Sequence, residues 1–408
     1  MNYLLIITYI VIFLISKVAF KHKYGYQWNS TFITTAIWCI FASIAVINPL
    51  GLRQPSLIVH GYSILFLLSF NIFSYIIHIK SVKFIKTKRK DKLIDLTNVN
   101  IRIASIEIAC IALIIPMLIL GFYAILSGNA NNYRFEVYFG EDQSFFTKTI
   151  PCAILNTIMI ISLYLFFRYN NKWHLANSLL IVVLLSIISA GRGTIFCYIM
   201  LYGFLSLYYR KIGTKHSRIP LVIGIIGICC LTIVVRGSDI LDSVILYFSG
   251  PFSFLDYILD NPQDYGLDTL HYGFITLSPI TEPLMYILKV LGLSAEKIPS
   301  YYLNAYVQDF VDIGAREMYL FNNNSTTLLH FILDGGWIGI VLGGFFLAYI
   351  SNKSYFYFIN NKIVGAIFYL YVINGLFMTT ISYQSFMSIT PFITIIITFF
   401  CVKPINDR

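Results

Sequence analysis

Long apolar runs separated by short polar segments dominate the chain from end to end. The runs are continuously apolar, whereas the strands of a transmembrane barrel alternate apolar and polar residues. A helix needs roughly 17 to 25 such residues to cross the hydrocarbon core of a bilayer. The pattern predicts an all-α polytopic integral membrane protein with about 11 (10–12) transmembrane helices. These helices are expected at residues 3–20, 30–48, 57–79, 103–126, 147–167, 175–190, 193–209, 219–235, 326–350, 363–381 and 388–402.

The polar residues between these runs are concentrated in a few segments. One loop, residues 236–325, is far larger than the others, and we expect it to be the main element outside the membrane. The chain is therefore expected to divide into an N-terminal membrane bundle (1–235), the large loop, and C-terminal membrane helices (326–408). Residues 127–146 form a second, shorter polar segment on the same side.

Two parts of the large loop have a helical pattern. Residues 239–260 alternate aspartates with apolar clusters and contain Gly250–Pro251, so we expect two short amphipathic helices lying at the membrane interface. Residues 269–291 are apolar but contain Pro279 and Pro283, which argues against a full span and fits a re-entrant segment.

The helix expected after the loop contains Gly335, Gly339 and Gly343 at four-residue spacing. This spacing predicts a face of small residues for close helix packing. No internal repeat or inverted pair of halves, as in many secondary transporters, is visible in the sequence.

Composition agrees with the pattern, because 58% of residues are hydrophobic, 12% are charged and the mean hydropathy is +0.75. A soluble globular protein is excluded. The net charge of +10 arises largely from residues 80–102, which we interpret as an anchor on anionic lipid and not as a nucleic-acid site. The seven cysteines lie in apolar segments without metal-binding spacing, so buried free thiols are expected.

The distribution of charge predicts the topology. One threading places all but eight of the 29 lysines and arginines on a single side, which should be the cytoplasm, with the N-terminus outside. The outward-facing residues are Arg53, Arg134, Lys148, Arg192, Arg236, Lys289, Lys297 and Arg316.

Arg192 stands between two glycines at the boundary of two apolar runs, and Arg236 is followed by a glycine at the end of another. A guanidinium forms two parallel hydrogen bonds to phosphate oxygens, so the two arginines together would suit a pyrophosphate. An arginine that reaches toward lipid headgroups is the alternative. Arg134 and Arg316 each have a glutamate nearby, so a surface ion pair is as well supported as ligand contact.

His271 is the only histidine expected on the outer side. Its imidazole is a natural acceptor for the proton of a sugar hydroxyl, although a structural role is equally consistent with its neighbour Tyr272. Glu317 is the next candidate base. Tyr272, Tyr301 and Tyr302 present aromatic faces that stack on sugar rings but also suit a membrane-interface belt. The sequence contains no DxD, Walker, GxGxxG or HExxH motif, so neither a metal nor another cofactor is expected.

Three segments resemble the Wzy-type O-antigen polymerases, which are oligosaccharide repeat unit polymerases of the bacterial inner membrane. They are SIISAGRGTIF (186–196), VVRGSDILDSVILYFSGPFSFLDY (234–257) and NNNSTTLLHFILDGGWIGIVLGG (322–344). The resemblance implies that Arg192 and Arg236, and more loosely Arg134, act in catalysis or in handling a lipid diphosphate. Through the third segment it adds Asn324 and Asp334 to the expected substrate-binding residues, beside Arg316.

The same resemblance implies a glycosyltransferase that uses polyprenyl-diphosphate-linked oligosaccharide as donor and acceptor. Expected partners are these lipid-linked sugars, the bilayer and a chain-length regulator protein, with no nucleic acid. Two other functions fit the sequence. One is a flippase or transporter for lipid-linked oligosaccharide, and the other is an O-antigen ligase, which uses the same donor with a different acceptor.

Overall fold

The computed structural model describes residues 2–24, 29–78, 96–129, 133, 149–189, 193–211, 240–293, 307, 309–315, 317–321, 325–359, 363–382, 386 and 389–402. The span expected at 219–235 and most of the polar segment 127–146 lie outside the described residues.

The described part of the chain is predominantly helical. The helices are α1 (Asn2–Tyr24), α2 (Ser30–Ile47), α3 (Leu57–His78), α4 (Leu96–Leu126), α6 (Ile150–Tyr169), α7 (Lys172–Ser189), α8 (Gly193–Lys211), α10 (Ile240–Asp260), α11 (Ser278–Val290), α13 (Leu328–Ile359), α14 (Ile363–Met378) and α15 (Thr390–Cys401). The strands β1 (Val311–Asp312) and β2 (Leu320–Phe321) form one antiparallel ribbon.

Seven of the described helices are long and apolar enough to cross a membrane, namely α1, α2, α3, α4, α6, α7 and α13. Three more, α8, α14 and α15, are apolar over shorter lengths. Apart from 219–235, each expected span coincides with one of these helices. The protein is therefore an all-α, multi-pass membrane protein.

The chain folds into two compact units, each assembled from separate stretches of sequence. The first contains residues 1–86, 241–356 and 375–391, and the second contains 87–240, 357–374 and 392–408. The compact units combine separate stretches of sequence, whereas the division into 1–235, 236–325 and 326–408 follows sequence order. That division concerns which segments lie in the membrane, and it stays a prediction.

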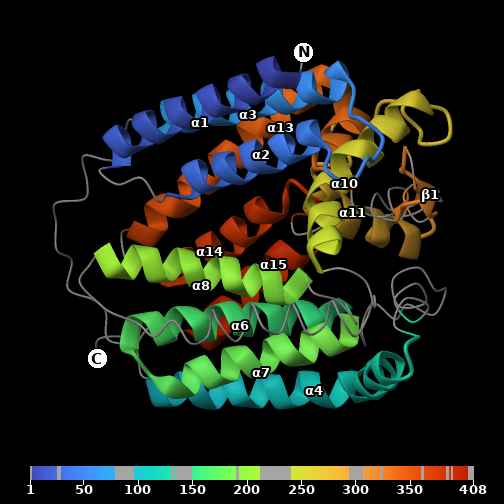
Figure 1. The fold of residues 1–408 in the computed structure, drawn as a ribbon. Helices are drawn as coiled ribbons and strands as arrows, with labels where there is room; N and C mark the ends of the chain where they lie inside the picture. Colours follow the sequence, from blue (N-terminus) through green and yellow to red (C-terminus); the bar gives the residue numbers. More distant parts are fainter. Residues whose placement is uncertain are drawn as a thin grey trace. The chain divides into compact units, whose positions relative to one another are not determined.

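In the first unit, α1, α2 and α3 lie side by side (Figure 1). Asn29 begins α2 by accepting the backbone N–H of Phe32 at 2.9 Å, and Asn48 ends it in the left-handed conformation. Trp38, midway along α2, packs against Phe66 of α3 and Phe252 of α10, with ring centroids 4.9 and 5.8 Å away. All three rings are fully buried, so these contacts belong to the core of the unit.

The chain reverses direction inside α13. Gly335 and Gly336 have non-helical dihedral angles, and φ of Gly336 is +57°. A Cβ on Gly339 would lie 2.0 Å from the carbonyl oxygen of Phe331, and one on Gly343 would lie 2.5 Å from its ring. The short helical segment before the break therefore folds back along the long segment after it. The predicted small-residue face exists, but Gly339 and Gly343 use it to pack against their own element.

Residues just before the reversal are bonded to the segment that follows α14 and, through it, to α2. The backbone N–H of Thr327 donates to Thr379 O at 2.8 Å, and the indole of Trp38 donates to Thr379 Oγ1 at 2.9 Å. Non-helical backbone at Thr326–Thr327 and Thr379–Ser382 thus lies level with the midpoint of α2. All of these residues are buried, as irregular backbone within a membrane must be unless it lines a cavity.

The two amphipathic helices expected over 239–260 are one continuous helix, α10, so that prediction was wrong. Pro251 removes one helical hydrogen bond, but tertiary packing around it compensates. Phe252, Phe254 and Leu255 are buried, and Phe321 of β2 packs so closely on Gly250 that a Cβ there would lie 2.6 Å from its ring.

Helix α11 falls within the segment 269–291 and has 13 residues, too few to cross a bilayer, as the two prolines predicted. One face carries the exposed apolar side chains Ile280, Leu284 and Ile287, while Glu282 and Met285 on another face are buried. This amphipathic pattern is typical of a helix that lies in a membrane interface.

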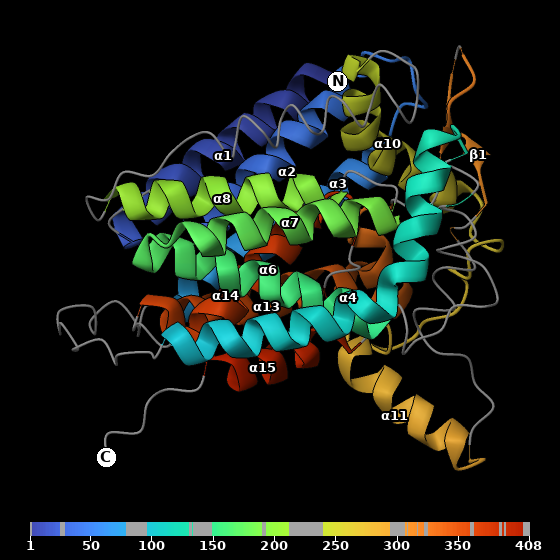
Figure 2. The ribbon, with the colours of Figure 1, turned by 90° about the horizontal axis from the view of Figure 1, so that it is seen from below.

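The second unit is built on α4, α6, α7 and α8, with α6 packed against the other three. Helix α4 contains Pro116 and is visibly bent (Figure 2). Its Gly121 lies so near α7 that a Cβ would be 2.4 Å from Ile187 O. Helix α15 joins the unit through Thr394, whose hydroxyl lies 3.1 Å from that of Thr157 in α6. The thiols of Cys110, Cys197 and Cys401 are free and buried, as expected, whereas Cys152 is partly exposed.

Candidate functional site

Polar side chains of the first unit gather in three neighbouring segments, residues 48–56, 256–277 and 309–321, which we call the polar cap. The β1–β2 hairpin is attached to the 48–56 segment by two backbone hydrogen bonds. Arg53 N donates to Ile313 O at 2.6 Å, and Ala315 N donates to Gly51 O at 3.0 Å.

The turn of this hairpin is held from within. The carboxylate of Asp312 accepts the backbone N–H groups of Gly314 and Tyr319, both at 2.9 Å. Gly314 approaches Glu317 O so closely that a Cβ would lie 1.7 Å from that oxygen. The side chain of Glu317 is exposed at this turn.

A charged cluster joins the 48–56 segment to the end of α10. The Nε of Arg53 lies 2.8 Å from the carboxylate of Asp256, and Nη2 contacts Asp260. Asp256 also accepts the backbone N–H of Ser56 at 2.8 Å. Partial burial acts to lower the pKa of Arg53, but the hydrogen bonds and charges of the two aspartates outweigh it and raise this pKa. Arg53 is therefore a structural cation.

A second anchor lies at the break in α13. The two carboxylate oxygens of Asp334 accept the backbone N–H groups of Ile275 at 3.0 Å and Thr276 at 2.6 Å. The carbonyl of Leu333 accepts the N–H of His271 at 2.9 Å. The loop 271–276 is thus attached at both ends to the residues just before Gly335.

The attached loop presents Tyr272 to the surroundings. Its backbone has φ of +49°, in the left-handed region that large side chains rarely adopt, and Gly273 follows with φ of +89°. The Tyr272 side chain is 87% exposed, so no packing of the ring explains this conformation. Backbone held in a rare conformation by its surroundings is a common property of functional sites.

Tyr265 lies in segment 256–277 of the polar cap. It is buried against Phe254 and Tyr257, at ring-centroid distances of 6.3 and 6.2 Å. Burial, with further contributions from Tyr257, Asp264 and Asp309, raises the pKa of Tyr265 to about 12. Its hydroxyl stays protonated at physiological pH and cannot act as a base there.

The structure brings together three of the predicted site residues, since Asp334 in α13 anchors the loop that contains His271 and Tyr272. Glu317 lies on a separate element, the hairpin turn. The carboxylate of Asp334 is occupied by backbone amides, so a role in substrate binding stays a prediction. The other predicted residues lie outside the described part of the chain, namely Arg134, Arg192, Arg236, Arg316, Tyr301, Tyr302 and Asn324.

Sequence reasoning did not single out Arg53 or Asp256. Asp256 and Asp260 are four residues apart in α10 and therefore share one helix face, which is a usable signal for a paired acidic site. Their partner is about 200 positions away in the sequence, and no local pattern identifies it.

Comparison with known proteins finds no family model, no curated protein and no solved structure that matches this chain. The assignment of function therefore depends on the residues and on the polar cap.

Proposed function

We propose that this protein is a glycosyltransferase that polymerises polyprenyl-diphosphate-linked oligosaccharide repeat units at the periplasmic side of a bacterial inner membrane. The observation that carries the proposal is the anchored loop, where His271 stands beside an exposed aromatic ring on a strained turn. A membrane bundle that bears an ordered polar cap suits a substrate whose lipid lies in the bilayer and whose sugars lie outside it.

In the proposed reaction, a hydroxyl of the acceptor sugar attacks the anomeric carbon of the donor. A new glycosidic C–O bond forms, and the bond from that carbon to the diphosphate oxygen breaks with its electron pair leaving on the lipid diphosphate. Arg192 and Arg236 neutralise the charge that develops there, with Arg134 and Arg316 as further phosphate contacts. The energy resides in the sugar–diphosphate bond, so the scheme needs neither a nucleotide nor a metal.

The hydroxyl proton is assigned to His271, with Glu317 as the alternative base. Tyr272 supplies an aromatic face for a sugar ring at the position next to His271. Asp334 accepts the backbone N–H groups of Ile275 and Thr276 and so holds the loop that carries His271 and Tyr272. Asp334 therefore acts as a positioning residue.

A flippase for the same lipid-linked oligosaccharide is the second candidate, and one observation in the second unit favours it. Glu107 is buried within the spanning helix α4 and interacts with Asn177 of α7, whose amide donates to Ser162 of α6 at 3.2 Å. Ionisable groups inside a membrane often mark the path of a proton or substrate.

Deletion of the gene separates the candidates when surface polysaccharide is displayed on a gel. A polymerase predicts that the ladder collapses to a band with a single repeat. Loss of all capped core would instead indicate a flippase or a ligase.

Complementation of the deletion strain then tests the residues. Arg192→Ala, Arg236→Ala and His271→Ala should each give the single-repeat band at matched expression, and Lys289→Gln, an exposed charge on α11, should restore the ladder. Arg→Lys should restore only part of the activity, because an ammonium lacks the bidentate geometry of the guanidinium. Full ladders from all three alanine variants would refute the assigned chemistry.

A further inference from the structure

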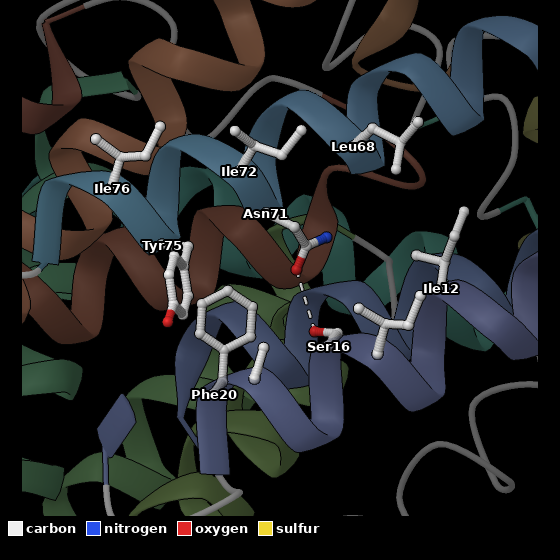
Figure 3. Close-up of a pocket in the computed structure, with 10 residues that line it drawn as sticks. Ile12, Ser16, Phe20, Leu68, Asn71, Ile72, Tyr75 and Ile76 are labelled. Carbon is white, nitrogen blue, oxygen red and sulfur yellow. Dashed lines mark hydrogen bonds between the residues drawn. The ribbon is translucent and has the colours of Figure 1, made fainter. Parts of the chain in front are cut away.

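A groove runs between α1 and α3 on the first unit, with a volume of about 330 Å³. This volume is at the lower end of the range for small-molecule sites. Ile12 and Phe20 of α1 face Leu68, Ile72 and Ile76 of α3 across it (Figure 3). Its walls are almost entirely hydrocarbon.

The polar atoms at the bottom of the groove are already paired. Ser16 donates to Asn71 Oδ1 at 3.1 Å, as Figure 3 shows, and Thr35 donates to the same oxygen at 3.1 Å. The amide of Asn71 donates to Leu67 O at 2.7 Å. A peptide backbone in this groove would find no hydrogen-bond partners, whereas a hydrocarbon chain needs none.

One end of the groove is positively charged. Ser16, Ala19 and Phe20 line the groove, and the same helical stripe continues to Lys23. The ammonium of Lys23 donates to Ser74 O at 3.0 Å and to Tyr75 O, and it lies 4.5 Å from the centroid of the Tyr75 ring, which also lines the groove. An ammonium has three donors, so one remains for a further acceptor.

A second lysine, Lys21 of α1, is exposed near this end beside His22. Neither α1 nor α3 contains an acidic residue. The expected topology places this end at the cytoplasmic leaflet, where anionic lipids are found.

We propose that the groove binds an anionic phospholipid of the cytoplasmic leaflet. One acyl chain lies between α1 and α3, and the phosphate group accepts a hydrogen bond from Lys23. The acyl chain of the ligand matches the hydrocarbon walls of the groove, and its negative charge matches the cationic end at Lys23. This ligand is separate from the lipid-linked sugar of the proposed reaction.

The test uses the purified full chain in detergent with equal amounts of phosphatidylglycerol and phosphatidylcholine that carry the same acyl chains. Native mass spectrometry should show that phosphatidylglycerol is retained preferentially. Ala19→Trp fills the groove and should abolish this retention, while Leu14→Trp, on an exposed face of α1 outside the groove, should not. Equal retention of the two lipids by the wild type, or equal effects of the two tryptophans, would overturn the proposal.

A second pair of variants tests the charge. Lys23→Gln should lower the preference for phosphatidylglycerol about fivefold, which corresponds to the ~1 kcal/mol that one lysine contributes near anionic lipid. Lys23→Arg keeps the charge and should keep the preference. Melting temperatures measured with each lipid give an independent reading, since a ligand that binds only the folded state raises them. An unchanged preference in Lys23→Gln would remove Lys23 from the site and contradict the proposed binding mode.

Discussion

The carboxylate of Asp334 accepts the backbone N–H of Thr276 at 2.6 Å, and this bond links the break in α13 to the loop that presents Tyr272. The second carboxylate oxygen accepts the N–H of Ile275, so one side chain satisfies two buried donors. The reversal at Gly335–Gly336 is what places Asp334 at this position.

Asp334→Ala should therefore lower the free energy of unfolding by about 1–3 kcal/mol, because it leaves buried backbone N–H groups without acceptors. Asp334→Asn should cost less, since the amide oxygen still accepts one of them. Unfolding by SDS in mixed micelles measures the difference, and Lys289→Gln, at an exposed position of α11, is the control with no expected change in stability. If Asp334→Ala were as stable as the wild type, the loop would have to be held by other contacts.

The contacts of Arg53 predict different costs for its two aspartates. The side chain of Asp256 is 6% exposed and that of Asp260 is 63% exposed. Asp256→Ala should destabilise the protein by about 2 kcal/mol, because it removes hydrogen bonds to a charged group. Asp260→Ala should cost less than about 1 kcal/mol, as exposed ion pairs do.

Arg53→Met completes this test, since it leaves the buried Asp256 without its cation and should cost about 3 kcal/mol. The double variant Arg53→Met/Asp256→Leu should recover part of that loss. Strictly additive effects in the double variant would show that the two side chains do not interact energetically.

The long apolar runs predicted the positions of the helices well because local composition determines them. The run 30–48, for example, corresponds to α2 (Ser30–Ile47). The reversal inside α13 was not predicted, because Gly335, Gly339 and Gly343 equally suit a straight helix packed on a neighbour.

The pairing of Arg53 with Asp256 was missed for a related reason, since only the tertiary fold brings them together. Likewise Pro251 suggested a helix break that packing against Phe321 overrides.

The reversal can be tested with glycine substitutions in the first unit. Gly339→Ala should destabilise by about 1–3 kcal/mol, because the new methyl group would overlap Phe331 O. Gly344→Ala should act similarly, since its Cβ would lie 2.2 Å from Ser69 Oγ in α3. Gly61→Ala is the matched control, because nothing lies within 4 Å of its Cβ and alanine favours the helix. Equal stability for Gly339→Ala and Gly61→Ala would mean that α13 does not fold back.

The topology predicts opposite locations for two segments. Reporter fusions at Asp264, in the polar cap, should indicate the periplasm, and fusions at Lys88, in the basic segment 80–102, should indicate the cytoplasm. Paired reporters that are active on opposite sides of the membrane measure this directly. The same location for both positions would exclude the proposed arrangement and with it a periplasmic active site.

Tyr272 offers a substitution that should separate stability from function. Tyr272→Gly relieves the left-handed backbone at φ of +49° and removes a ring that is 87% exposed, so we expect it to stabilise the protein by about 0.5–1 kcal/mol. Tyr272→Ala keeps the strained backbone and should leave stability nearly unchanged. Both variants lose the aromatic face and should shorten the polysaccharide ladder, whereas Tyr272→Phe should preserve it. Full-length ladders from the glycine and alanine variants would show that the ring does not contact sugar, and the strain at residue 272 would then reflect only the anchoring of the loop by Asp334.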